Sequence, residues 1–116
     1  MRHKKKGRKL SRDRDHRGAL LSNLVKDLIF YEEITTTHPK AKELVRLAEK
    51  TISLAREDSV HHRRLALKVI KDKKVLKKLF EVIGPRYRER KGGYVSLVKV
   101  GYRRGDGALL SRVKLV

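Results

Sequence analysis

The residues that could perform metal or acid–base chemistry are five histidines and two pairs of adjacent acids. His61 and His62 are neighbours, so on a helix their side chains point about 100° apart and cannot share a metal as residues four apart would. The other three, His3, His16 and His38, have no metal-ligand spacing to one another. The spacing therefore predicts no metal site and favours histidines that are solvated or face a nucleic acid.

The acidic pairs do not predict catalysis either. Glu32-Glu33 and Glu57-Asp58 fall at expected helix ends and lack a companion motif, which favours structural acids. Ser59 has two histidines nearby in the sequence but lacks the glycine pattern of a nucleophile elbow. We therefore expect a protein that is not an enzyme and has no cofactor.

Lysine and arginine are the most abundant ionisable residues of the chain. Its 116 residues include 32 Lys and Arg against 13 Asp and Glu, a formal net charge of +19. A free protein this positive repels itself, and a polyanion is the partner best able to neutralise it. Arginine binds phosphate bidentately, and a tyrosine beside arginines can stack an unpaired base. Tyr87, Tyr94 and Tyr102 stand beside arginines, and one or two of them are expected to belong to the core instead. The composition therefore predicts nucleic-acid binding.

The basic residues are concentrated at the two ends of the chain. Residues 1–17 contain nine bases and two acids, residues 84–116 again contain nine and two, and the longer middle contains fourteen and nine. A charge that only kept the chain soluble would not need this asymmetry, so we expect two RNA-binding regions. The first comprises Arg2, His3, Lys4, Lys5, Lys6, Arg8, Lys9, Arg12, Arg14, His16 and Arg17. The second comprises Arg86, Tyr87, Arg88, Arg90, Lys91, Tyr94, Lys99, Arg103, Arg104, Arg112 and Lys114, and Arg63 and Arg64 are added from the middle.

The first ten residues are expected to be disordered before binding. Only Met1 and Leu10 could bury apolar surface there, and the like charges repel. Ordering ten such residues costs roughly 10–20 kcal/mol of backbone entropy, which a polyanion can offset through many charge-assisted contacts. We expect a basic N-terminal arm, residues 1–12, followed by a single domain, residues 13–116.

Composition also excludes several protein classes. The absence of cysteine excludes disulfides, thiolate chemistry and a cysteine-based zinc site. No apolar run approaches the roughly 20 residues of a membrane span. Leu10 is followed by more charge, so the start of the chain lacks the apolar core of a signal peptide. Neither secretion nor membrane insertion is expected.

Hydrophobic periodicity predicts four helices that would position these side chains. They are expected at residues 13–32, 39–56, 60–71 and 73–83. Ser59 and Asp72 can cap the third and fourth helices, and Gly84 followed by Pro85 predicts a strong stop. On the fourth helix we expect these apolar side chains to face inward: Val75, Leu76, Leu79, Phe80, Val82 and Ile83.

Three strands complete the expected fold. The short β-branched segment Ile34–Thr37 favours an extended conformation, and residues 94–102 and 108–116 resemble a hairpin with its turn at residues 103–107. The element order predicts an α+β domain of two layers: helix, strand, three helices and two strands, with the helices on one side of a small mixed sheet.

The buried faces of the two hairpin strands differ in how well the pattern defines them. In the last strand Ser111 and Val113 alternate with Arg112 and Lys114, so one face is predicted to meet the core. In residues 94–102 the two faces are equally apolar, and the pattern leaves the choice open.

Five groups of residues carry a resemblance to a known family. They are Met1-Arg2-His3-Lys4 with Gly7-Arg8-Lys9-Leu10 and His16-Arg17; Thr36-Thr37 with Pro39-Lys40-Ala41-Lys42-Glu43-Leu44; Glu57-Asp58-Ser59 with Arg63-Arg64-Leu65-Ala66; Gly84-Pro85-Arg86-Tyr87 with Arg90 and Gly92-Gly93-Tyr94; and Lys99 and Gly101 with Arg103-Arg104-Gly105-Asp106. Through them the chain resembles the bacterial large-subunit ribosomal protein L17 family, in order and along its whole length.

The resemblance implies a structural constituent of the 50S subunit, bound to 23S rRNA near the exit side of the polypeptide tunnel, in the cytoplasm. It implies neighbouring ribosomal proteins, L32 among them, and neither a membrane nor a small-molecule substrate. The fold that it implies agrees with the element order above.

From the residues alone, three other function classes stay open. A DNA-compacting protein would carry the same charge, and competition between rRNA and duplex DNA at matched salt would separate the two. A nuclease or RNA-modifying enzyme would turn over labelled RNA with a divalent metal, although the chain shows no cluster for it. A membrane-surface protein would sediment with lipid vesicles.

Overall fold

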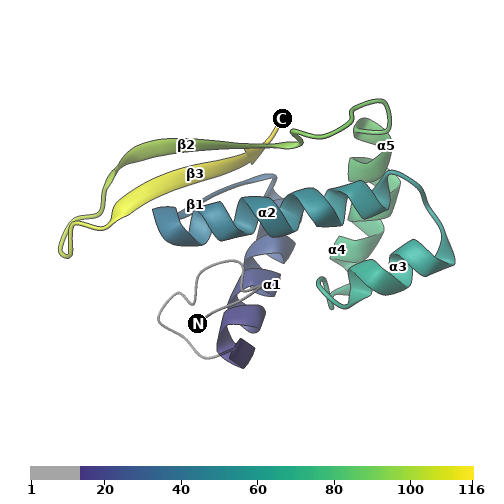
Figure 1. The fold of residues 1–116 in the computed structure, drawn as a ribbon, viewed down its shortest axis with the longest axis horizontal. Helices are drawn as coiled ribbons and strands as arrows, with labels where there is room; N and C mark the ends of the chain where they lie inside the picture. The colour runs from purple at the N-terminus through teal and green to yellow at the C-terminus, as the bar shows by residue number, and fades with distance from the viewer. Residues whose placement is uncertain (1–13) are drawn as a thin grey trace, which may run out of the picture.

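The computed structural model describes residues 14–116, so the predicted arm lies outside the described residues (Figure 1). The elements follow the expected order. They are α1 (Arg14–Tyr31), β1 (Glu33–Thr37), α2 (His38–Ala55), α3 (Val60–Leu67), α4 (Lys73–Lys78), the π-helical turn η1 (Leu79–Ile83), α5 (Gly84–Arg86), β2 (Val95–Tyr102) and β3 (Leu109–Leu115). The α+β class predicted from the sequence is confirmed.

Side-chain caps separate the middle helices as predicted. The Ser59 hydroxyl accepts a hydrogen bond from the His62 N–H at 3.0 Å, and the Asp72 carboxylate accepts one from the Lys74 N–H at 2.9 Å. The third helix ends at Leu67, four residues earlier than expected, because the chain turns there to bury Ile70 completely. These caps satisfy N–H groups that would otherwise lack partners at the helix starts.

The predicted helix stop at Gly84-Pro85 is wrong. The helix continues through η1, in which the Gly84 N–H donates to the Leu79 carbonyl five residues back, and ends only after Arg86. Gly84 serves packing instead, since a Cβ built on it would lie 2.0 Å from the Ala55 carbonyl oxygen. A glycine in this sequence position therefore marks a close approach of two helices and not a helix end.

The side chain of Val82 was expected to face inward and is 46% exposed, because η1 turns Leu79, Phe80 and Ile83 to the core instead.

The sheet has the order β1-β3-β2 and is antiparallel throughout. The prediction of a mixed sheet is therefore wrong. The last strand enters between the other two and runs opposite to both, with Val113 opposite Ile34 on one side and Leu97 on the other. A β-bulge between Lys99 and Gly101 bends β2, and Gly101 supplies the positive φ of 144° found there.

The helices cover one face of this sheet, as predicted (Figure 1). In Figure 1, α2 lies along the sheet with α1 on its other side, and the β2–β3 hairpin extends past the start of α2. Ser111, Val113 and Leu115 are buried against the helices, which confirms the face predicted for the last strand. In β2 it is Val95 and Leu97 that pack on the core, while Val98 and Val100 are exposed.

One side-chain contact joins the start of α2 to the centre of the sheet. His38 Nδ1 lies 2.7 Å from the fully buried Ser111 hydroxyl, which gives this polar atom a partner inside the core. Within residues 14–116 no helix combines the length and apolar character that crossing a membrane requires.

Candidate RNA-binding surface

The tip of the β2–β3 hairpin is held by one acid. Asp106 accepts hydrogen bonds from two nitrogens of the Arg103 guanidinium, with Nε at 3.1 Å, and from the Ala108 N–H at 3.1 Å. These bonds, Arg103 first, lower the pKa of Asp106 to about 2. Across the turn the Arg103 N–H donates to the Ala108 carbonyl at 2.7 Å. Arg103 is thus occupied, while the adjacent Arg104 is exposed and has no acid partner among residues 14–116.

Tyr102 is the most exposed of the large apolar or aromatic side chains in the described part of the chain, at 75%. It stands immediately before Arg103 and Arg104 at the end of β2. Its ring is therefore open to an external partner. The sequence pattern grouped Tyr102 with Tyr87 and Tyr94 as a tyrosine beside arginines, but Tyr102 was not among the expected site residues.

Tyr87 and Tyr94 belong to the core, as expected for one or two of the three tyrosines beside arginines, so their rings are not open to stack RNA bases. Both are buried, and their ring centroids lie 5.4 Å apart. The Tyr87 hydroxyl donates to the Val116 carbonyl, and the Tyr94 hydroxyl donates to the Arg90 carbonyl at 3.2 Å. Buried tyrosines normally find such a partner for the hydroxyl. The pair anchors the segment between α5 and β2 to the end of the sheet.

The segment between α5 and β2 presents three basic side chains outward. Arg88, Arg90 and Lys91 are exposed, and Arg90 Nε donates to the Gly92 carbonyl at 3.2 Å. Arg56, which was not expected to take part, donates to the Arg88 carbonyl at 2.9 Å and so fixes this segment to the end of α2.

On α3 the structure separates two adjacent arginines. Arg63 binds Asp58 bidentately at 2.6 and 2.8 Å and lies over the Phe80 ring, 5.1 Å from its centroid. The hydrogen bonds to Asp58 raise the pKa of Arg63, and those from Arg63 lower the pKa of Asp58. Arg64 is exposed and makes no ion pair within the described range.

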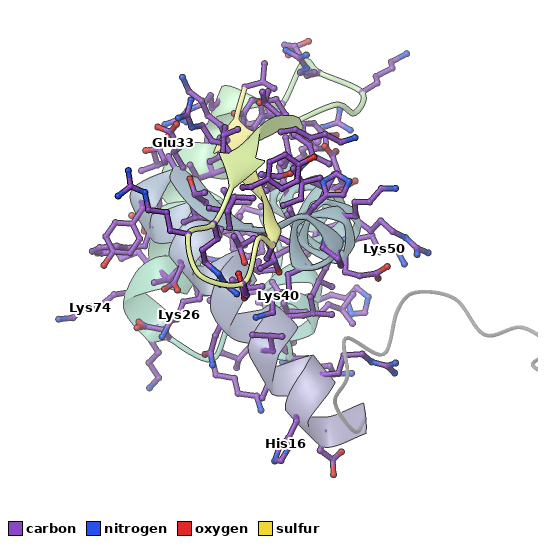
Figure 2. All side chains as sticks on the ribbon, turned by 90° about the vertical axis from the view of Figure 1, so that its left-hand side faces the viewer. His16, Lys26, Glu33, Lys40, Lys50 and Lys74 are labelled. Atoms are coloured by element: carbon purple, nitrogen blue, oxygen red, sulfur yellow. The ribbon has the colours of Figure 1, made fainter. Side chains whose placement is uncertain are left out.

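On the sheet face away from the helices, Arg112 pairs with Glu33 at 3.0 Å, whereas Lys114 on the same strand is exposed. Lys99 is exposed at the bulge of β2. On α1, Arg17 is half-buried and His16 exposed, and Figure 2 shows His16 near the start of this helix. Arg14 opens α1, and the predicted contacts from Arg2 to Arg12 lie outside the described residues.

The predicted cations from Arg63 onward thus form two groups. Four arginines are held by acids, namely Arg63, Arg86, Arg103 and Arg112. Seven cations are exposed with no acid partner within residues 14–116, and we call these the open cations: Arg64, Arg88, Arg90, Lys91, Lys99, Arg104 and Lys114. A polyanion can bind the open cations without breaking an ion pair.

Across residues 14–116 no three His, Asp or Glu side chains come together to hold a metal. An open groove of about 820 Å³ lies between α1 and residues 68–72 and is lined by Ser22, Lys26, Lys68 and Asp72 among others.

Glu32 forms the most connected ion pair of the described residues. It ends α1 with a positive φ of 66° and contacts Arg86 and Lys78, the latter at 3.1 Å. The Arg86 hydrogen bond, followed by that of Lys78, lowers the pKa of Glu32 below its ordinary value. This acid therefore joins α1 to α4 and α5.

The Glu32→Gln variant should have a lower free energy of unfolding than the wild type at pH 7. This difference between the two chains should disappear in acid. Because the folded-state pKa is depressed, the Glu32 contribution is complete above its ordinary pKa of 4.5 and disappears as the pH falls through the lower folded value. Urea titrations of wild type and variant between pH 7 and pH 3 measure this difference. Glu57→Gln, at an exposed acid without an ion pair in the described range, is the control. A wild-type to Glu32→Gln difference that is constant with pH would contradict the assignment.

Comparison with known proteins identifies the family. The model of the family "Ribosomal protein L17" matches residues 20–116. The chain is 51% identical over 116 residues to "Large ribosomal subunit protein bL17" of Anaeromyxobacter sp. (strain Fw109-5), covering 100% of this chain and 69% of the relative. The protein of the same name from Caldanaerobacter subterraneus subsp. tengcongensis is 53% identical over 109 residues, which cover 94% of this chain and 97% of that relative. The protein of the same name from Syntrophus aciditrophicus (strain SB) is 48% identical over 116 residues, which cover 100% of this chain and 93% of that relative.

Nearly the whole chain is matched at about half identity, and the resemblance first noticed in the sequence motifs is confirmed. The chain belongs to the ribosomal protein L17 family, whose members are structural components of the large ribosomal subunit in the cytoplasm and not enzymes.

Proposed function

We propose that the chain binds 23S rRNA in the large subunit and stabilises the folded packing of that RNA. The observation that carries the proposal is the projecting β2–β3 hairpin. Its exposed side chains include Tyr102 and the cations Lys99, Arg104 and Lys114, which have no acid partner in the described range. Family membership supports an RNA-rich assembly as the setting.

The mechanism is electrostatic. Phosphates of packed RNA helices repel one another, and lysine and arginine side chains reduce that repulsion while releasing counterions. Recognition is mainly of shape and backbone, because double-stranded RNA does not expose its base edges to side chains in the major groove. The open cations supply the first contacts. Arg103 and Arg112 can exchange their acids for phosphate, since exposed ion pairs contribute only about 0–1 kcal/mol.

Arg63 and Arg86 take a lesser part in this proposal. To bind phosphate they would have to release Asp58 and Glu32, and Arg63 would also leave the Phe80 ring. Each is paired with an acid, so it adds little net positive potential beside the open cations.

The arm is the second binding region of the proposal. Residues 1–12 precede the domain and carry Arg2, His3, Lys4, Lys5, Lys6, Arg8, Lys9 and Arg12. An extended segment of this length reaches about 35–40 Å, enough to cross an A-form helix. We propose that the arm follows one defined path between RNA helices in the assembled particle. The resemblance alone supports L32 as a protein neighbour.

Sedimentation of the full chain with 50S subunits tests the proposal. The chain should stay with the particle through a sucrose gradient in high salt, and particles assembled without it should be defective. Movement of the chain to the top fractions, with normal particles in its absence, would argue against the proposal. Duplex DNA competing as well as 23S rRNA at matched salt would point to the DNA-compacting alternative.

Tyr102→Ala should weaken binding to 23S rRNA by about tenfold, within the 1–3 kcal/mol expected for one stacked base. The free energy of unfolding should hardly change, because the ring is exposed. Tyr102→Phe, which keeps the aromatic face, is the matched control and should bind like the wild type. Affinities measured by filter binding at one salt concentration test the assignment, and equal affinities for all three chains would reject it.

A further inference from the structure

A polar pocket of about 550 Å³ lies at the end of the domain away from the hairpin tip. Figure 1 shows the three segments that meet there, namely the C-terminal end of α2, the start of α3 and the chain that leads from α5 to β2. Each segment brings a nitrogen-bearing side chain to the wall: Lys50 and Arg56 from the end of α2, His62 from α3 and Lys91 from the chain after α5. Pockets of this size are large enough to take a small ligand.

Arg56 carries a half-buried charge that no acid balances. Its Nε atom is enclosed by the protein and has no hydrogen-bond partner among residues 14–116. One terminal nitrogen donates to the Arg88 carbonyl at 2.9 Å, which orients the guanidinium but supplies no full negative charge. No acid of the described residues forms an ion pair with Arg56. A charge partly removed from water costs free energy until an opposite charge compensates it.

The acid beside the pocket leaves the other cations unbalanced as well. Glu49 lines the wall, and its carboxylate accepts the Val95 N–H at 2.9 Å, which holds the start of β2. It is the one acid against three cations among the described residues that line the pocket. Neither Lys50 nor Lys91 forms an ion pair within residues 14–116. The walls therefore keep an excess of positive charge that attracts an anion.

His62 adds an acceptor to this set of donors. Its Nδ1 lies 2.8 Å from the Glu57 carbonyl oxygen, which can only accept, so Nδ1 carries the hydrogen. In the neutral ring Nε2 is then an acceptor, and it has no hydrogen-bond partner within the described range. A ligand that suits both features combines an anion with a hydroxyl group, as a ribose phosphate does. An aspartate or glutamate side chain of a protein partner offers the anion without such a donor.

We propose that this pocket binds one nucleotide of the rRNA by its sugar and phosphate. Lys50, Arg56 and Lys91 surround the phosphate, and His62 Nε2 accepts from the 2′-hydroxyl, a group that DNA lacks. Because the pocket and the hairpin tip lie at opposite ends of the domain, the chain then joins two segments of RNA (Figure 1). The inference rests on the proposed function and adds to it a contact site that reads ribose.

Titration of the full chain with dinucleotides tests the proposal. The probes are the ribodinucleotide ApA and its 2′-deoxy counterpart at the same pH and ionic strength, with backbone amide signals followed by nuclear magnetic resonance. ApA should shift the signals of Ser53, His62 and Lys91 and bind about fivefold more tightly than the deoxy probe, as one hydrogen bond does. Equal affinities, or shifts spread evenly over the exposed lysines, would overturn this inference alone.

Two further results would also decide against the pocket as an rRNA site. A hexaglutamate peptide that shifts the same signals at lower concentration than ApA would assign the pocket to an acidic protein. Failure of the chain to co-sediment with 50S subunits would overturn the proposed function and, with it, rRNA as the source of the nucleotide.

Substitution gives a second, independent measurement. Arg56→Gln and Lys91→Ala should each weaken binding to 23S rRNA by about tenfold, as loss of a charge-assisted contact does. Lys91 is exposed, so Lys91→Ala leaves the fold intact even if Arg56→Gln disturbs the hold on Arg88. Lys73→Ala removes the same charge from an exposed position on α4 and should change the affinity by less than about twofold. Equal losses for all three variants would mean that only net charge matters and would overturn the inference.

Discussion

Gly84→Ala should lower the free energy of unfolding by about 3 kcal/mol or more, at the upper end of the cost of overpacking a core. The added methyl group would lie 2.0 Å from the Ala55 carbonyl oxygen and 2.8 Å from its carbon. Both are backbone atoms at the end of α2, so no side-chain rotation can make room. Relief requires α2 and the η1–α5 segment to separate. Urea denaturation of the full chain, followed by circular dichroism, measures the loss.

Gly18→Ala is the matched control for that substitution. Gly18 is also helical, yet it is exposed on α1 and a Cβ there would meet no atom within 4 Å. Alanine restricts the unfolded chain and favours helix, so this variant should gain about 0.5–1 kcal/mol. If Gly84→Ala gained stability as Gly18→Ala does, helix propensity would outweigh the close approach to Ala55 and the packing role of Gly84 would be refuted.

Deleting residues 1–9 should make RNA binding far less dependent on salt. The segment contains six lysines and arginines, and each phosphate neutralised contributes about 0.7–0.9 to the slope of log affinity against log salt. If all six bind phosphate, the slope falls by about four to five, and the affinity lost between 50 and 200 mM salt becomes about 10²–10³ times smaller. Filter binding to 23S rRNA over that range measures the slope.

The control for the deletion removes charge from the folded body. Lys73, Lys74 and Lys77 are exposed on α4 and we expect them to be solvated, so replacing all three by alanine should change the slope by less than about one unit. A slope that is unchanged by the deletion would refute the role proposed for the arm. A slope that falls equally in both chains would mean that only net charge matters.

Features encoded over a few residues could be predicted from the sequence. Ser59 and Asp72 cap their helices as expected because capping depends on residues two or three positions away. The buried face of the last strand followed from the alternation of Ser111 and Val113 with charged neighbours. The open face of β2 could not be chosen, because the choice depends on the position of α2 and on the bulge before Gly101.

The less successful predictions share one cause, which is that the deciding partner is distant in sequence. Gly84 has the signature of a helix end, and only the approach of Ala55 shows its role in packing. Three tyrosines adjoin arginines, and tertiary structure buries Tyr87 and Tyr94 while exposing Tyr102. The sequence alone predicts that Arg86 is a free cation. In the fold it binds Glu32, which lies 54 residues earlier in the chain.

The position of β3 at the centre of the sheet sets the order in which a growing chain can fold. Both edge strands precede β3 in the sequence, and β1 forms its ladder only with β3. During synthesis β1 therefore has no strand partner until residues 109–115 have been added, whereas helices close their hydrogen bonds locally. The N-terminal cations are synthesised before the sheet can form, so the arm that we propose binds RNA would be available while the domain is still incomplete.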